Sequence, residues 1–162
     1  MMITIRKYRD EDKEQIWKII EYVISKGDSF NNLPDSPRDE MLADWCSPEK
    51  HTFVAVSENK IVGTFYVKEN QSGLGSHIAN GSYMVAPEAR GKGVGRLMGE
   101  FSIAEAKRLG FRAMQFNFVV KSNEKAVKLW KSLGFEIIGE IPEAFRHIEN
   151  GFTNAYIMYR RL

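Results

Sequence analysis

The chain has 162 residues, enough for one domain, and its 43% hydrophobic and 27% charged residues are typical of a globular protein rather than a disordered or collagen-like one. Its formal net charge of +2 is too small, and its cations too evenly spread, to indicate a nucleic-acid partner. Cys46 is the single cysteine, and no apolar run resembles a signal peptide or a membrane span, so we expect a cytoplasmic protein with no membrane partner.

The first third of the chain predicts a strand followed by two helices. The strand is "ITIRKY", and Asp10 is placed to cap a helix that has isoleucines at helical spacing. Gly27 ends this helix, and the loop "GDSFNNLPDSPRDE" leads to a short helix around Met41 to Trp45. A loop of this length inside a compact domain often carries function.

The middle of the chain predicts a strand hairpin, a third strand and a helix. "TFVAVSENKIVGTFYVK" gives two strands with a turn at Ser57 to Lys60, and a third strand covers roughly His77 to Ala86. A helix then ends at Gly110, and its expected apolar face consists of Val94, Leu97, Met98, Phe101, Ala104 and Leu109.

The last part predicts three strands around one more helix. "FRAMQFNFVV" reads as a strand buried on both faces. Ser122 or Asn123 caps the helix that follows, Gly134 ends it, and "FEIIGEI" and "NAYIMYRRL" are the final strands. The strands at 77–86 and 112–120 flank a helix, so we expect them to be parallel and joined by a right-handed crossover. The predicted fold is α+β, a single domain over residues 1–162 with a mixed, mostly antiparallel sheet and helices on both faces.

A turn rich in glycine and cations joins the third strand to its helix. The stretch "VAPEARGKGVGRLMGEF" places three glycines and three cations at a helix start: Arg90, Gly91, Lys92, Gly93, Gly95 and Arg96. Free backbone amides and the helix dipole make such a start an anion site, and the cations suit a diphosphate. The alternative is an empty glycine-rich connection. The spacing matches neither the P-loop nor the dinucleotide-binding fingerprint, which excludes both nucleotide readings.

The motif that does match, R-x-x-G-x-G preceded by "VAPE", resembles the acetyl-CoA signature of the GNAT-type N-acetyltransferase superfamily. A second segment of that superfamily follows in "SNEKAVKLWKSLGFEIIGE", which is similar to its N-x-x-A-x-x-x-Y-x-x-x-G-F pattern. The order of predicted elements also resembles that of the superfamily over essentially the whole chain, so the resemblance implies a GNAT-like fold with acetyl-CoA as co-substrate.

The resemblance also implies which residues bind the cofactor. The backbone amides of Arg90 to Arg96, including Val94, would hold the pyrophosphate of CoA. The strand from Tyr83 to Val85 would hydrogen-bond the pantetheine arm and polarise the thioester carbonyl, with the neighbouring parallel strand splayed away to admit the arm. Asn123 and Trp130, on the next helix, would contact the cofactor.

Two positions depart from the superfamily pattern. Trp130 stands where a tyrosine often acts on the leaving thiolate, and an indole cannot be that acid, so Trp130 also fits a core aromatic. Ala79 stands where many members carry a glutamate. Asn80 and Asn117 lie nearby on the two parallel strands and either line the cleft, orienting amine and thioester, or are satisfied structural amides. The first reading implies catalysis by positioning, with water removing the amine proton.

Several other residues are candidates for the catalytic or acceptor site. His77, His147 and Tyr83 could lie near the cleft, although a lone histidine is more often a surface residue. Arg146 and His147 could bind a substrate carboxylate or belong to a solvated loop. No cluster of His, Cys and Asp has metal-ligand spacing, so no metal is predicted.

The predicted function is transfer of an acetyl group from acetyl-CoA to the primary or secondary amine of a small molecule. The alternative is a non-catalytic acyl-CoA-binding sensor, favoured by the missing tyrosine and glutamate. The two asparagines, with "IPEAFRH" and "AYIMYRRL", are similar to a microbial branch that includes azetidine-2-carboxylate acetyltransferases. Acceptor specificity is expected from loops near Phe30–Pro37, Gly73 and Arg146, and the superfamily's frequent dimers leave a homodimer open.

Overall fold

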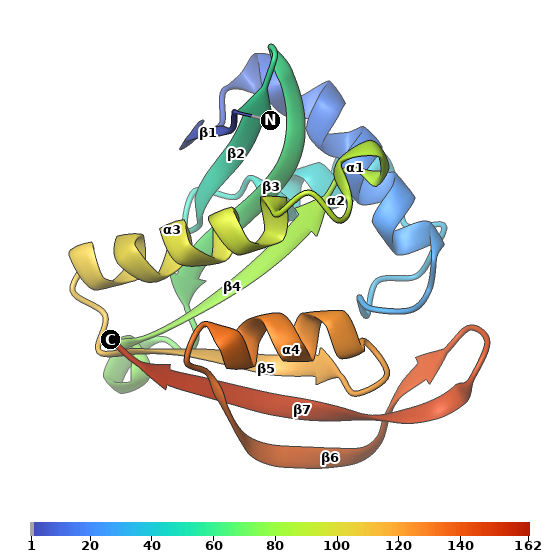
Figure 1. Ribbon diagram of the computed structural model, residues 1–162, viewed down its shortest axis with the longest axis vertical. Coiled ribbons are helices and arrows are strands. Elements are labelled where there is room, and N and C mark those ends of the chain that lie inside the picture. Colours follow the sequence, from blue (N-terminus) through green and yellow to red (C-terminus); the bar gives the residue numbers. More distant parts are fainter. Residues whose placement is uncertain (1) are drawn as a thin grey trace.

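The computed structural model describes residues 2–162 as one seven-stranded sheet with helices on both faces (Figure 1). The strands lie in the order β1-β2-β3-β4-β5-β7-β6, and β4 with β5 is the parallel pair among antiparallel neighbours. In chain order the main elements are β1 (Thr4–Lys7), α1 (Lys13–Ser25), α2 (Arg38–Trp45), β2 (His51–Ser57), β3 (Lys60–Glu69), β4 (Ile78–Val85), α3 (Val94–Arg108), β5 (Ala113–Val120), α4 (Glu124–Ser132), β6 (Glu136–His147) and β7 (Gly151–Arg161).

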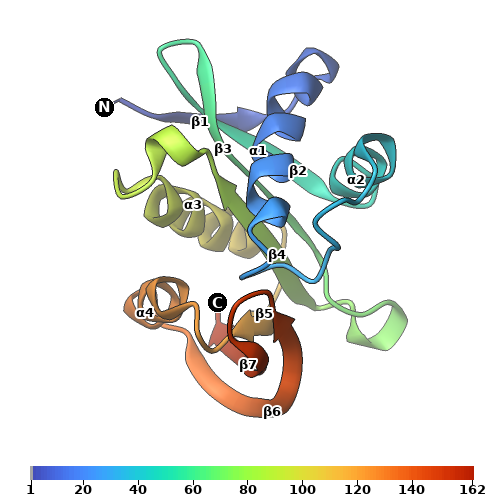
Figure 2. The ribbon, with the colours of Figure 1, turned by 90° about the vertical axis from the view of Figure 1, so that its right-hand side faces the viewer.

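The helices divide between the two faces of the sheet. Figure 2 shows α3 and α4 on one side and α1 and α2 on the other. The crossover from β4 through α3 to β5 confirms the predicted parallel pair, and the mixed sheet confirms the predicted fold class. No helix within residues 2–162 has both the length and the apolar character needed to cross a membrane.

The predicted hairpin is confirmed, and its turn explains the register of β2 against β3. Glu58 and Asn59 both have positive φ, which a two-residue hairpin turn of the type that matches strand twist requires. Ser57 therefore pairs with Lys60 and Val56 with Ile61. The register then shifts by one residue between Val56 and Ala55, and the ladder continues to His51 opposite Val67.

The central feature of the sheet is a separation between β4 and β5. Their ladder holds two pairs, Ile78 with Ala113 and Ala79 with Met114, and then ends. Beyond it, β4 stays paired with β3 as far as Val85, while β5 stays paired with β7 as far as Val120. Figure 1 shows the two strands diverging from a common end, which confirms the predicted splay.

Two hydrophobic cores surround this V. One core joins α1 and α2 to β2 and β3 and includes the fully buried Ile16, Ile20 and Phe65. The other joins α4 to β5 and β7 and also takes in Val67 of β3, Ala79 of β4 and Ala106 of α3. Tyr83 on β4 packs against both, so one side chain connects the two arms.

Four local predictions were wrong. Asp10 lies in a short 3-10 turn, and α1 begins at Lys13 instead. Leu97 is 41% exposed and Ala104 is also exposed, because α3 buries its small residues Gly99, Ser102 and Ala106. Asn117 is exposed, so β5 is not buried on both faces.

The fourth error concerns the end of the chain, where β6 and β7 are longer than predicted. Arg146 and His147 belong to β6, not to a solvated loop. The register of β6 shifts between Ile141 and Phe145, around Pro142 and Glu143. A proline cannot donate a ladder hydrogen bond and is confined to edges and bulges, so its presence concealed the continuation of the strand.

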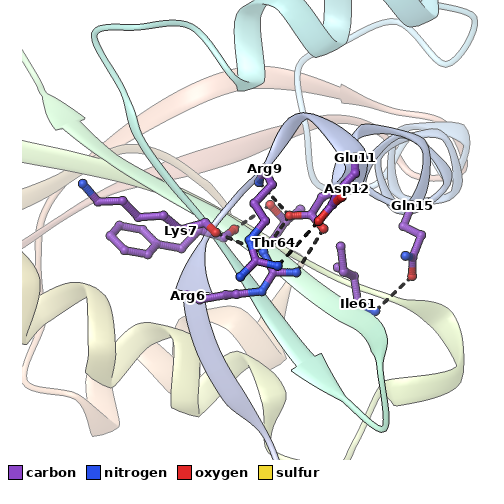
Figure 3. A network of polar contacts seen from close by, with 9 residues as sticks. Arg6, Lys7, Arg9, Glu11, Asp12, Gln15, Ile61 and Thr64 are labelled. Carbon is purple, nitrogen blue, oxygen red and sulfur yellow. Dashed lines mark hydrogen bonds and ion pairs between the residues drawn. The ribbon is translucent and has the colours of Figure 1, made fainter.

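Asp12 fastens the start of α1 to β1 (Figure 3). Its carboxylate accepts hydrogen bonds from Arg6 Nη1 at 2.7 Å, Arg6 Nη2 at 3.0 Å and the backbone N–H of Arg9 at 2.7 Å. The Asp12 side chain is only 6% exposed. These bonds, led by that of Arg6, hold the pKa of Asp12 below its usual range against the opposing effect of burial.

We therefore predict that Asp12→Asn lowers the free energy of unfolding by about 2 kcal/mol at neutral pH, the scale of a hydrogen-bonded charge pair. Because folding lowers the pKa of Asp12, its stabilisation is complete above the unfolded pKa of about 4 and is lost as the pH falls toward the folded value. Urea unfolding at pH 7 and pH 3 measures the difference, which should shrink at the lower pH.

The control is Glu11→Gln, since Glu11 is 73% exposed and pairs with Arg9 at 3.5 Å. Its effect should stay within about 0.5 kcal/mol. A loss for Asp12→Asn that is equally large at pH 3 would contradict the ionic account.

Candidate functional site

The glycine turn lies at the carboxyl end of β4, where the V is open. Gly91 has φ +74° and Gly93, the N-cap of α3, has φ +82°, conformations that favour glycine. A side chain at either position would meet nothing within 4 Å, so the space beside the turn is open to a ligand. The backbone amides at the start of α3 lack intrahelical acceptors, as they do in every helix.

The cations of the turn are available to that space. Arg90 and Lys92 are exposed. Arg96 lies 3.7 Å from Glu100 and donates a hydrogen bond of 3.4 Å to Ser132 on α4, so it spans the gap between α3 and α4. Exposed cations and the free amides of a helix start occur together in this turn, a combination that favours a phosphate group.

Val85 and Gly95 form the wall between the turn and the V. A Cβ on Gly95 would lie 4.0 Å from the Val85 side chain and 3.5 Å from Leu129 on α4. These are ordinary van der Waals distances, so a small side chain at position 95 would fit between β4 and α4. Val94, the next residue toward the turn, is buried and anchors the first turn of the helix in the core.

A cavity of about 290 Å³ occupies the V between the two arms. On the α4 side it is lined by Asn123, Ala126 and Trp130, and between the strands by Tyr83 and Phe116. On the other side it is lined by Ser29, Phe30, Asn31, Asn32, Met41, Asp44, Trp45, Tyr66 and Ser82. The cavity thus passes from one face of the sheet to the other.

Asn123 and Trp130 both line the cavity from α4 and its N-cap. Asn123 caps α4, accepting the N–H of Ala126 at 3.5 Å, which resolves the choice between Ser122 and Asn123. Trp130 is 7% exposed, and its ring lies 4.7 Å from that of Tyr83 and 4.6 Å from that of Phe116. It is a core aromatic that also lines the cavity, so the two readings of Trp130 do not exclude each other.

Tyr83 presents its ring to the cavity and its hydroxyl to α3. The hydroxyl lies 2.6 Å from Ser102 Oγ, and Ser102 donates to the carbonyl of Gly99 at 2.8 Å. The Ser102 proton is thereby used, so the tyrosine is the donor in the first bond. Burial raises the pKa of Tyr83 well above its usual range, so the phenol stays protonated.

Asn80 and Asn117 lie at the closed end of the V, where the β4–β5 ladder stops. The Asn70 side-chain oxygen accepts a hydrogen bond from Asn80 Nδ2 at 3.3 Å and another from Asn117 Nδ2 at 2.7 Å. They are satisfied amides, and neither lines the cavity. Asn70, which follows β3, was missed, because its polar, glycine-rich surroundings read as an ordinary loop.

The histidines and Arg146 are not part of this cavity. His77 is exposed. His147 Nδ1 accepts the backbone N–H groups of Glu149 and Asn150 at 3.1 Å each, which fixes the β6–β7 turn. Arg146 and His147 line a neighbouring cavity of about 410 Å³ that shares Phe30, Asn31 and Asn32 with the first.

The loops expected to shape an acceptor pocket differ in position. The loop near Phe30 lines both cavities, and the region of Arg146 lines the second. Gly73 lines neither. Trp45 and Tyr66 complete the aromatic wall with ring centroids 4.8 Å apart, and these were missed because their burial makes them indistinguishable from core residues in the sequence.

No group of three or more metal-ligating side chains occurs within residues 2–162. Asp44 is the one carboxylate of the cavity wall, and Lys50 Nζ lies 3.1 Å from it. The site therefore combines a turn rich in glycine and cations, two separated strands and an aromatic chamber, with little ionisable chemistry of its own.

Known proteins are similar to this chain in both sequence and fold. The family model for the acetyltransferase (GNAT) family matches residues 10–135. The N-acetyltransferase aca1 of Schizosaccharomyces pombe is 39% identical over 101 residues, 62% of this chain and 48% of that protein, so the matched region spans about half of the relative.

Two solved structures are similar over nearly the whole chain. A GCN5-related N-acetyltransferase from Kribbella flavida is 38% identical with a TM-score of 0.94, covering 99% of this chain and 98% of that one. YncA, described as a putative acetyltransferase from Salmonella typhimurium with its cofactor acetyl-CoA, has a TM-score of 0.87 at 23% identity, covering 100% and 95%. Acetyl-CoA is thus bound by a protein of the same fold.

α3 and α4 approach each other most closely at Gly99 of the two α3 glycines that face α4. A Cβ on Gly99 would lie 2.8 Å from Leu133 and 3.0 Å from the Trp130 ring, whereas one on Gly95 would make an ordinary contact of 3.5 Å. We expect Gly95→Ala to raise the free energy of unfolding by up to about 1 kcal/mol through helix propensity. The free energy of unfolding of Gly99→Ala should be about 1–2 kcal/mol lower than that of Gly95→Ala, because Trp130 must move.

Urea unfolding of both variants, with tryptophan fluorescence as the probe, measures this difference. The two glycines lie on the same helix, so each variant is the control for the other. Equal stabilities would contradict the close α3–α4 approach at Gly99.

Proposed function

Since the chain belongs to the acetyltransferase (GNAT) family, we propose that it transfers an acetyl group from acetyl-CoA to the primary or secondary amine of a small molecule. The observation that carries the proposal is the V between β4 and β5, which has an anion-binding turn at its open end and an aromatic cavity inside it. A long cofactor with phosphates at one end and a thioester at the other matches that arrangement.

The residues of the turn fit the pyrophosphate of acetyl-CoA. The open space beside Gly91 and Gly93 admits phosphate oxygens to the backbone amides from Arg90 to Arg96. Arg90, Lys92 and Arg96 would add charge-assisted hydrogen bonds. Val94 and Gly95 would contribute their backbone N–H groups, while the buried Val94 side chain anchors the helix in the core.

The two separated strands fit the pantetheine arm. Beyond Ala79 and Met114, the facing edges of β4 and β5 are not paired with each other, and backbone groups there need partners. The amides of the arm can supply them, in the manner of an added strand. The segment from Tyr83 to Val85 would hold the arm on β4, with Asn123 and Trp130 on α4 covering it.

Acetyl-CoA supplies an activated acyl group, so the chain needs mainly to position the acceptor. The amine nitrogen forms a bond to the acetyl carbon, the carbon–sulfur bond breaks with its electron pair leaving on sulfur, and the amine proton passes to water. The Tyr83 hydroxyl is committed to Ser102 and Trp130 does not ionise, so neither serves as the acid. Backbone donors on β4 would stabilise the developing oxyanion.

The acceptor would enter from the α1–α2 face. Phe30, Trp45 and Tyr66 form an apolar wall there, and the cavity of about 290 Å³ must also admit the acetyl end of the cofactor. That volume suits a small acceptor. The amine panel described below tests which small amine is the acceptor, and it includes azetidine-2-carboxylate.

Residues 1–162 would act as a single acetyl-CoA-binding domain, since both arms of the site belong to one continuous sheet. We also propose that the protein is cytoplasmic and that it has no nucleic-acid partner. The cytoplasmic location is supported by the single cysteine, Cys46, which cannot form an internal disulfide. A homodimer remains part of the proposal that gel filtration can test.

The direct test is release of free CoA when the purified chain is mixed with acetyl-CoA and a panel of amines. The panel contains amino acids, proline, azetidine-2-carboxylate, polyamines, aminoglycosides and peptides with free N-termini. We expect one class of small amine to be acetylated, because the chamber is small and mostly aromatic. Binding of CoA by calorimetry without turnover on any amine would instead favour a non-catalytic acyl-CoA sensor.

Substitution of Gly93 tests the role of the glycine turn in binding acetyl-CoA. Gly93→Val should weaken binding of acetyl-CoA by at least about tenfold, because a β-branched residue at φ +82° strains the turn by about 1–2 kcal/mol and covers its amides. Calorimetry measures the change in affinity.

The control is Gly73→Val. Gly73 also has positive φ, +61°, and open space around it, but it lies in the β3–β4 loop away from the turn. It should bear a similar strain and leave the affinity unchanged. Native affinity in Gly93→Val would remove the turn from the proposed site.

A further inference from the structure

Three side-chain amides meet where the β4–β5 ladder ends. Asn70 follows β3, Asn80 lies on β4 and Asn117 lies on β5, so the three residues come from three adjacent strands. Asn80 comes one residue after Ala79, the last residue of β4 that pairs with β5. The backbone N–H of Asn70 also donates to the carbonyl of Ile78 at 2.8 Å, which holds its own position against β4.

The direction of every hydrogen bond in this group follows from one backbone donor. The N–H of Gly81 can only donate, and it donates to Asn80 Oδ1 at 2.7 Å. Asn80 must therefore turn its Nδ2 toward Asn70, whose Oδ1 accepts at 3.3 Å. The same oxygen accepts Asn117 Nδ2 at 2.7 Å.

The chain of bonds ends on β5. With Nδ2 committed to Asn70, Asn117 turns its Oδ1 to Gln115, whose Nε2 donates at 3.0 Å. The Asn70 side chain thus acts in this group as an acceptor, while the side chains of Asn80 and Asn117 act on it as donors. A single oxygen joins the two arms of the V at the point where their backbone ladder stops.

We propose that Asn70 is a positioning residue for acetyl transfer, and that its side-chain oxygen sets the relative position of β4 and β5 at the closed end of the V by accepting hydrogen bonds from Asn80 and Asn117. The inference rests on the proposed function. The anion-binding turn lies at the open end, so a cofactor that lies between the strands directs its thioester toward the closed end. Asn70 therefore acts on the reacting end of the cofactor rather than on its phosphates.

This position separates the effect on rate from the effect on binding. Most contacts with a cofactor would come from the turn at residues 90–96, which Asn70 does not touch. Loss of the Asn70 oxygen lets Asn80 and Asn117 separate, which changes the geometry at the thioester and leaves the phosphate contacts as they are. Small errors of position at a reacting centre are costly in rate.

The test compares isosteric variants. Asn70→Leu removes the acceptor, whereas Asn70→Asp keeps an oxygen that can accept both bonds. Asn117→Asp instead replaces a required donor by an acceptor that faces the Asn70 oxygen. We expect kcat to fall about tenfold or more in Asn70→Leu and in Asn117→Asp, the equivalent of one hydrogen bond, with the Kd for CoA unchanged within about threefold. Asn70→Asp should recover most of the rate.

Gln71→Leu, a change at the next and exposed residue, is the control for the loop and should leave kcat and Kd as in the native chain. Native kcat in Asn70→Leu would overturn the proposal. Equal impairment of Asn70→Asp and Asn117→Asp would overturn the assigned direction of the bonds.

Urea unfolding gives a readout independent of activity. If the directions are correct, Asn117→Asp is less stable than Asn70→Asp, although each carries the same substitution. This comparison also applies if Asn70→Leu fails to fold. If the native chain turned over no amine, the proposed function would fail, while the stability difference would still test the role of Asn70 in joining the strands.

Discussion

The parting of β4 and β5 after two residue pairs is the constraint on which the rest of this structure depends. Each strand keeps its outer partner, β3 for β4 and β7 for β5, so the sheet stays continuous while its centre opens. Backbone groups on the facing edges then require other partners, because unpaired buried amides and carbonyls are costly. A ligand with its own amides can supply them, as the pantetheine arm would in the function proposed here.

An open sheet would be unstable without contacts that span the opening. Tyr83 supplies one, since its ring packs with Phe65 in one core and with Phe116 and Trp130 in the other. Its hydroxyl is held by Ser102 on α3, so the same residue ties β4 to the helix that begins at the glycine turn. The amide group around Asn70 supplies the other contact, on the opposite face. Tyr83, Asn80 and Asn117, which the sequence suggests as catalytic candidates, therefore help to hold the two arms of the V together.

The site contains few ionisable groups, and this agrees with the chemistry proposed for it. A thioester is already activated, so the protein has to place two reactants and stabilise charge with backbone donors rather than to supply a strong base. The missing glutamate and tyrosine of the superfamily pattern are then not defects of the site. Precision of placement becomes the main requirement, which explains why amides and aromatic rings, rather than carboxylates and histidines, surround the cavity.

The sequence by itself determined the fold class, the parallel crossover, the hairpin turn and the glycine turn, because each depends on residues close together in the chain. Alternating apolar residues specify strands, and Gly91 and Gly93 permit a backbone that few other residues adopt. Only the tertiary structure decided that α3 buries Gly99 and Ser102 instead of Leu97, that β6 continues past Pro142, and that Asn80 and Asn117 share the oxygen of Asn70. These outcomes depend on partners tens of residues away, and side-chain contacts across strands leave no periodic signal in the sequence.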